Sequence, residues 1–326
     1  MGLSDRIFSG DSVQRYAPNQ ALQKRQDQAF QKGHDVAAIK TYRYLRLAML
    51  AAVAALSYSI LEERFASGVN CFVGSISGYY YSPVHPIFVG VMVSIGLALL
   101  VIKGRTVIED TCLSLAGVLA PIVALVPTTY DSSDTCAATM AGVGHYLPPA
   151  KDPRVAANSI SNGLHAYLVA GSVAIALVGV AFLAQLLRSK RNSGTTTLEY
   201  TKGTLWTLVA AVVFVLIAWA FVELDYSLVL QGHAWSAIGM FAFLAIAALS
   251  NGILGITKDY TKLGYSVSYI GVGALMVLSG IMFLAARSSD KSTFGGHLVL
   301  YVEVVDLVLF TAFWAIQTVE RWHDTV

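Results

Sequence analysis

The feature that most constrains this chain is a series of apolar segments, each long enough for a helix to cross a membrane. Such a helix needs roughly 20 mostly apolar residues to span about 30 Å of hydrocarbon. Eight segments qualify: residues 42–61, 86–102, 111–128, 159–187, 204–222, 233–256, 265–286 and 296–319. Their apolar side chains cover all faces of each expected helix instead of one stripe, which favours lipid over a soluble core. The sequence therefore predicts an all-α polytopic transmembrane bundle of about eight spans.

The distribution of basic residues predicts how the bundle is oriented. If both termini are cytoplasmic, 17 of the 22 lysine and arginine residues fall in the inner segments. This bias follows the positive-inside rule and suits anionic lipid headgroups. Residues 1–41 then form a cytoplasmic, partly helical segment, and residues 42–326 form the bundle. Only 13% of the residues are charged, against about 25% in soluble domains. We therefore expect the lipid bilayer as a partner and no nucleic acid.

Two of the three cysteines fall in segments that this orientation places outside. Cys71 precedes the second span and Cys136 follows the third. An oxidising outer compartment favours a disulfide between them; two unpaired buried thiols are the alternative. Cys112 lies at the inner end of the third span, so we expect it to stay reduced.

The eighth span contains two acidic residues. Glu303 and Asp306 are three residues apart, so they share one helix face. A charged residue at the bilayer centre costs about 2.5–3.5 kcal/mol on insertion scales, and both side chains should therefore face the interior of the bundle. No lysine or arginine lies in the middle of a span to neutralise them. We expect a proton or cation site here, and two protonated carboxyls bonded to neighbouring helices are the alternative.

Histidines recur near the outer ends of the inward-running spans, and acids near the outer ends of the others. The predicted outer-face polar cluster consists of His85, His165, Glu223, Asp225, His233 and His297. Imidazole and carboxylate groups together can bind Zn or Cu, or respond to pH. The alternative is that these histidines only cap helices at the headgroup level. The spacing of these histidines does not predict any particular metal site.

The outer segment between the first two spans contains Tyr79, Tyr80 and Tyr81. With neighbouring hydroxyl groups they can line a polar pocket, although a belt of interfacial aromatic residues has the same pattern. The sequence contains no Walker A motif, Rossmann fingerprint, HExxH or GxSxG. It therefore indicates no particular reaction.

Three motifs resemble those of a group of uncharacterised bacterial polytopic membrane proteins. They are Ser75-Ile76-Ser77-x-Tyr79-Tyr80-Tyr81-Ser82-Pro83 with Phe88-Val89-Gly90, Leu115-Ala116-Gly117 with residues 123–128, and Glu303 with Phe313-Trp314-x-x-Gln317-Thr318. The resemblance covers the first three spans and extends loosely over the rest. That group has no assigned activity, so the resemblance implies a bacterial plasma membrane and no mechanism.

Three functions are compatible with these features. The first is transport of a small solute or ion, coupled to protons through Glu303 and Asp306. The second is a non-catalytic subunit of a larger membrane complex, with a membrane-protein partner or a second copy of the chain packed on small residues. The third is an intramembrane metal-dependent lipid hydrolase that uses the outer histidines and acids.

Overall fold

The computed structural model describes residues 40–128, 134–146, 153–191, 226–258, 262–288 and 297–322, with a few single positions between 209 and 220. All regular elements in these residues are helical. They are an N-terminal helix (Lys40–Ala66), η1 (Ser77–Tyr81), α2 (His85–Val101), α3 (Val107–Leu125), α4 (Thr135–Gly142), α5 (Pro153–Arg191), α7 (Tyr226–Thr257), α8 (Leu263–Ser288) and α9 (Leu298–Glu320).

Seven of the eight predicted spans correspond to helices in the described residues, and six of these helices are long and apolar enough to cross a membrane. The seventh, α2, is shorter at 17 residues. The chain is therefore a multi-pass α-helical membrane protein. The N-terminal segment up to residue 39 lies outside the described residues, as does most of the predicted fifth span (204–222), of which only single helical positions are described.

The predicted helix boundaries differ from the observed ones where capping decides them. The sequence predicts that the third span begins at residue 111, but α3 begins at Val107. Thr106 fixes this start, because its hydroxyl oxygen accepts a hydrogen bond from the N–H of Glu109 (3.1 Å). An N-cap of this kind satisfies a backbone donor that the helix leaves unpaired. Helix α5 also begins earlier than predicted, at Pro153 rather than at residue 159.

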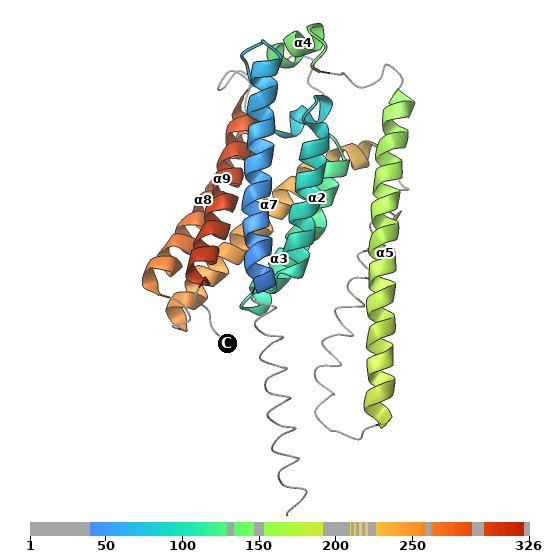
Figure 1. Cartoon of the computed structure of the whole chain (residues 1–326), viewed down its shortest axis with the longest axis vertical. Coiled ribbons are helices and arrows are strands. Elements are labelled where there is room, and N and C mark those ends of the chain that lie inside the picture. The colour runs from blue at the N-terminus through green and yellow to red at the C-terminus, as the bar shows by residue number, and fades with distance from the viewer. Residues whose placement is uncertain are drawn as a thin grey trace, which may run out of the picture.

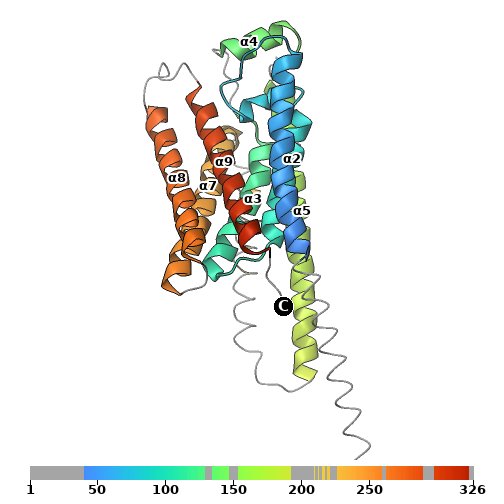
Figure 2. The same ribbon diagram turned by 60° about the vertical axis from the view of Figure 1, so that its left-hand side comes forward.

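The helices form an upright bundle with a small helix across one end. Figures 1 and 2 show α4 lying above the end where the Lys40–Ala66 helix finishes, while α5 stands at the edge of the bundle and extends past the other helices at the opposite end. We call the end below α4, which carries Cys71 and Cys136, the disulfide end. The opposite end, where α3 begins and α9 finishes, is the Glu109 end.

Glycines bring the backbones of two helix pairs into contact. A Cβ atom added to Gly96 of α2 would lie 2.8 Å from the carbonyl oxygen of Gly117 in α3, and 2.9 Å from Cδ of Pro121. Likewise, a Cβ atom on Gly252 of α7 would lie 2.7 Å from the carbonyl oxygen of Ser266 in α8. Small residues permit this close approach of helices in lipid. They make α2–α3 and α7–α8 tightly packed pairs.

Apolar side chains cover the outside of the bundle. Large apolar residues are exposed on several helices, for example Leu177 on α5 (65%), Leu263 on α8 (67%) and Val308 on α9 (61%). Among the spans that the structure describes, residues 160–184 of α5 are the most exposed, with only 6% of the most apolar window buried. Surfaces of this kind suit the hydrocarbon of a bilayer. Lipid is therefore the solvent for most of this surface.

Candidate functional site

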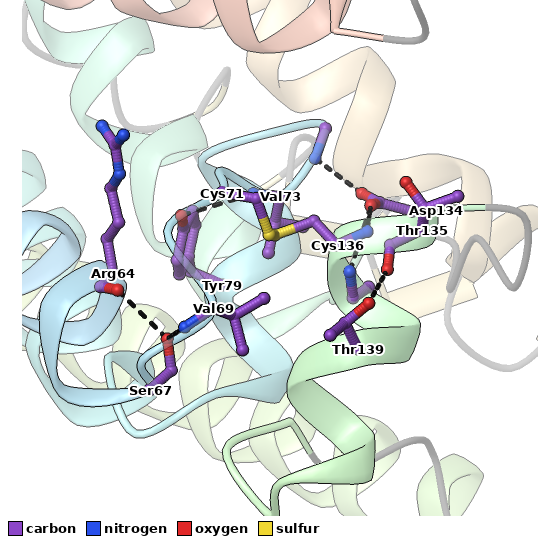
Figure 3. The surroundings of a disulfide bond; sticks show 12 residues. Arg64, Ser67, Val69, Cys71, Val73, Tyr79, Asp134, Thr135, Cys136 and Thr139 are labelled. Atoms are coloured by element: carbon purple, nitrogen blue, oxygen red, sulfur yellow. Dashed lines mark hydrogen bonds between the residues drawn. A yellow bond between two sulfur atoms is a disulfide. The ribbon is translucent and has the colours of Figure 1, made fainter.

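A cap closes the disulfide end; it consists of residues 67–84 and 134–146. Cys71 and Cys136 are bonded, which joins the segment after the N-terminal helix to α4 across 65 residues of sequence. Asp134 supports this junction, because its carboxylate accepts hydrogen bonds from the backbone N–H groups of Cys136 (2.9 Å) and Gly74 (2.7 Å). Figure 3 shows Asp134 next to Cys136 and the disulfide. The two segments of the cap are thus tied by a covalent bond and by a shared carboxylate.

We expect loss of the disulfide to destabilise the cap. Changing Cys71 and Cys136 to serine together should lower the free energy of unfolding by about 2–4 kcal/mol, because a cross-link restricts the unfolded chain. The thermal midpoint in detergent, followed by tryptophan fluorescence, measures the change. Cys112→Ser, at the buried free thiol of α3, is the control and should leave the midpoint near that of the wild type. An unchanged midpoint in the double variant would contradict this role of the bond.

The three tyrosines are packed into the cap. Tyr79 is fully buried, and its hydroxyl oxygen accepts a hydrogen bond from the N–H of Val73 (3.3 Å). Tyr81 donates to the carbonyl oxygen of Thr128 (2.9 Å), and the ring of Tyr80 lies 4.0 Å from that of His85. Burial raises the pKa of Tyr79 to about 12 and also raises the pKa of Tyr80. Tyr79 therefore belongs neither to an interfacial belt nor to the lining of an open pocket.

Glu303 fastens α9 to the cap. Its carboxylate accepts hydrogen bonds from the hydroxyl of Ser77 (2.7 Å) and from the backbone N–H of Ile76. One turn earlier in α9, the N–H of Leu300 donates to the carbonyl oxygen of Gly74 (2.9 Å). The partners of Glu303 thus come from the loop around η1. This acid anchors a loop, which distinguishes it from the second acid of the predicted pair.

Asp306 lies one turn further along α9, inside the bundle, and is only 5% exposed. Ser279 of α8 faces it, yet Asp306 Oδ1 and Ser279 Oγ are both buried without a hydrogen-bond partner in the described residues. Asp306 forms no ion pair with any described residue, and α9 contains no lysine or arginine. The side chain therefore faces inward, as the sequence predicts, and its charge has no compensating cation in the described part of the chain.

Aromatic side chains fill the interior between Asp306 and the Glu109 end. Phe313 and Trp314 are 1% and 0% exposed, and their ring centroids lie 5.0 Å apart. Phe310 packs against Trp314, with a centroid distance of 6.2 Å. From α8, the ring of Tyr269 lies 5.8 Å from that of Phe313. These rings separate Asp306 from the polar groups at the Glu109 end.

A second polar cluster is centred on Glu109, which is completely buried. Its Oε1 accepts hydrogen bonds from the side-chain amides of Asn251 on α7 (2.8 Å) and Gln317 on α9 (2.7 Å). Its Oε2 accepts one from the backbone N–H of Arg105 (2.5 Å) and lies 3.7 Å from the guanidinium of Arg321. Both oxygens of this buried carboxyl group are therefore satisfied by polar partners from α7, from the C-terminal end of α9 and from the loop before α3.

Glu320 extends this cluster to α8. One carboxylate oxygen pairs with the guanidinium of Arg105 (3.1 Å), and the other accepts a hydrogen bond from the hydroxyl of Tyr269 (2.6 Å). We name the whole set the Glu109 cluster: Arg105, Glu109, Asn251, Tyr269, Gln317, Glu320 and Arg321. It contains two acids and two bases, so its formal charge is balanced. It joins α3, α7, α8 and α9 at one end of the bundle.

The contacts of the Glu109 cluster are not predicted from the sequence. Two signals point toward it. The pattern Thr106-x-x-Glu109 matches a capping box, although here the glutamate bonds to the N–H of Arg105. The amides Asn251 and Gln317 are the second signal, because an amide in an apolar span requires a polar partner. Neither signal reveals that the three side chains meet.

The histidines of the predicted outer-face cluster do not converge in the described residues. His165 contacts the carbonyl oxygen of Ser161 (2.7 Å), and His233 contacts that of Val126 (2.7 Å). His85 packs on Tyr80, and His297 occupies the N-cap of α9 with its Nδ1 buried and unbonded in the described residues. Glu223 and Asp225 lie outside the described residues. Within that part of the chain, no group of three or more His, Cys, Asp or Glu side chains is arranged to hold a metal ion.

His145 was not part of that predicted cluster, and its ring contacts a buried acid at the disulfide end. Its Nδ1 lies 2.9 Å from Oε1 of Glu63, whose side chain is 6% exposed. This contact ties the end of the N-terminal helix to the segment after α4. Like Glu303, it links the helical bundle to the cap.

The fold and these clusters define a class of protein, a multi-pass α-helical membrane protein with buried acidic groups at two levels of the bundle. No protein-family model, curated protein or solved structure matches the chain.

Proposed function

We propose that this chain transports a small solute or ion across a membrane and that Asp306 carries the coupling proton or cation. The observation behind the proposal is the burial of the Asp306 carboxyl in an apolar span, with Oδ1 unbonded and no basic side chain paired to it in the described residues. An uncompensated carboxylate is costly in such surroundings, so the group must take up a proton or a cation. A site that alternates between loaded and empty states is what coupled transport requires.

The geometry divides the two acids of α9 between different roles in this proposal. Glu303 already has hydrogen-bond donors from the η1 loop, so we assign it to holding the cap against α9. Asp306 remains the titrating group. The aromatic layer of Phe310, Phe313 and Trp314 then represents a closed barrier between Asp306 and the Glu109 end.

We also propose the membrane and the orientation. The segregation of lysine and arginine places the Glu109 end in the cytoplasm and the disulfide end outside, where oxidation of Cys71 and Cys136 is favoured. A bacterial plasma membrane fits this arrangement. The resemblance to uncharacterised bacterial membrane proteins stays a prediction.

Proton flux into proteoliposomes tests the role of Asp306. Liposomes loaded with a pH-sensitive dye receive a potassium diffusion potential, with sodium, potassium or chloride gradients added in turn. We expect the wild type to move protons under at least one gradient, and Asp306→Asn to fall to the rate of empty liposomes. Asp110→Asn is the matched control, since it neutralises a partly exposed acid, and it should keep the wild-type rate. A wild type that never exceeds empty liposomes, or an Asp306→Asn variant that equals it, would refute the proposal.

A structural subunit is the second candidate, and the surface of α5 supports it. Val173, Leu177 and Val180 are exposed by 53%, 65% and 65% along this helix. A partner helix can cover such a surface as well as lipid can. Purification in mild detergent should then recover a partner in fixed stoichiometry, whereas a lone monomer would argue against this candidate.

A further inference from the structure

The last helix is held at both ends by polar side chains. At the disulfide end, Glu303 bonds to the η1 loop, and Leu300 bonds to Gly74. At the other end, Gln317 bonds to Glu109 and Glu320 pairs with Arg105. Its middle packs through side chains against α8, as in the contact between Phe313 and Tyr269. The attachment of α9 to α3 therefore depends on the Glu109 cluster.

Two other helix pairs, α2–α3 and α7–α8, are joined by direct backbone contact. Gly96 and Gly117 place the backbones of α2 and α3 in direct contact, and Gly252 and Gly273 do the same for α7 and α8. Helix α9 contains no glycine, so no glycine contact of this kind joins it to α3. Close-packed helices move as rigid units, whereas polar contacts at a helix end can exchange for water. The attachment of α9 to α3 therefore differs in kind from these backbone contacts, because it consists of polar side chains at one end of the bundle.

We propose that the Glu109 cluster is a gate. When its bonds exchange for water, the C-terminal end of α9 moves away from α3, while Glu303 and the disulfide-linked cap hold the opposite end in place. The structure represents the closed state, in which Glu109 is 0% exposed and all four helices are joined. Opening admits water from the Glu109 end toward the aromatic layer. This proposal states which helix moves, and it holds whichever ion or solute is transported.

The chain contains its own reporter for this movement. Cys112 follows Glu109 by one turn in α3, is 7% exposed and is the only cysteine outside the disulfide. A charged thiol reagent needs water at the sulfur atom to react. Its rate of reaction therefore measures how often water reaches the region behind the Glu109 cluster.

The test applies a membrane-impermeant cationic methanethiosulfonate to purified protein in oriented vesicles, from one face at a time. Tyr269→Phe removes only the hydroxyl bond to Glu320, and Glu320→Ala removes both that bond and the pair with Arg105. Loss of a buried bond to a charged group shifts an opening equilibrium by about tenfold or more. We expect Glu320→Ala to raise the labelling rate of Cys112 by about tenfold, with a smaller rise for Tyr269→Phe, and only from the face of the Glu109 end.

Two controls make the result specific. Cys112→Ser should abolish labelling, and Asp110→Asn should leave the rate unchanged, since the exposed pair of Asp110 with Lys103 lies outside the cluster. Rates that stay at the wild-type value in both cluster variants would overturn the gate. An equal rise from both faces would also overturn it, because it would indicate general loosening. Should Glu320→Ala fail to fold, Tyr269→Phe alone decides the question. None of these results depends on the flux carried by Asp306.

Discussion

Neutralising Glu109 as Glu109→Gln should lower the free energy of unfolding by about 3 kcal/mol or more, the typical cost of removing one partner from a buried ion pair. The carboxylate accepts donors from Asn251, Gln317 and the backbone of Arg105, and it faces Arg321. A glutamine side chain has one acceptor oxygen, and its NH₂ group would oppose the donors around the other position. Arg321, only 13% exposed at its side chain, would lose its charge partner. The thermal midpoint of unfolding in detergent measures this loss of stability.

The neighbouring acid provides a matched comparison for this variant. Asp110→Asn also removes one negative charge from the first turn of α3, but Asp110 and its partner Lys103 are 34% and 64% exposed at their side chains. The asparagine retains an oxygen for the N–H of Gly104, which Asp110 binds at 3.1 Å. An exposed pair contributes about 0.2–1 kcal/mol, so the control should lose no more than this. Equal losses in the two variants would show that burial of Glu109 does not determine its contribution.

The second large effect is expected at Gly96, where α2 and α3 touch. A methyl group there would lie 2.8 Å from the carbonyl oxygen of Gly117, a backbone atom that cannot move aside alone. Gly96→Ala should therefore separate the two helices and lower the free energy of unfolding by about 1–3 kcal/mol, the usual range for overpacking. The thermal midpoint reports this loss.

Gly90, in the same helix, is the control for Gly96. A Cβ atom on Gly90 meets no other atom within 4 Å. Alanine favours a helix over glycine by about 0.8–1.0 kcal/mol, so Gly90→Ala should raise stability or leave it unchanged. The two substitutions are chemically identical, and they are expected to act in opposite directions. Loss of stability in both would assign the effect to the glycine chemistry itself rather than to the contact between α2 and α3.

The sequence is sufficient to predict the membrane-spanning helices that the structure describes and the disulfide between Cys71 and Cys136. Each span is a local property, visible as a run of apolar residues, and its length follows from the thickness of a bilayer. The inward direction of Asp306 also followed from local chemistry, because an acid in a helix such as α9 cannot face lipid. Cys71 and Cys136 were identified together because both fall beside spans on the same predicted side.

The clusters of the site depend on contacts that no local pattern specifies. Glu109 meets Asn251 and Gln317 across 142 and 208 residues of sequence, and Glu303 meets Ser77 across 226. These distances are set by how the helices are arranged around one another. The three tyrosines show the same limit. Their sequence pattern resembles that of an interfacial belt, but Tyr79 is buried in a cap that joins α4 to a loop far away in the sequence.

The long separation between Glu109 and its partners has a consequence for how the protein is made. Glu109 enters the membrane early during synthesis, whereas Gln317 and Arg321 belong to the last helix. Until that helix arrives, the acid lacks two of its partners. A ribosome that stops before residue 317 therefore releases a chain with an incompletely compensated acid among its spans. In such a truncated product, Glu109 lacks the amide of Gln317 and the guanidinium of Arg321, and we expect the product to be less stable and more easily degraded than the full chain.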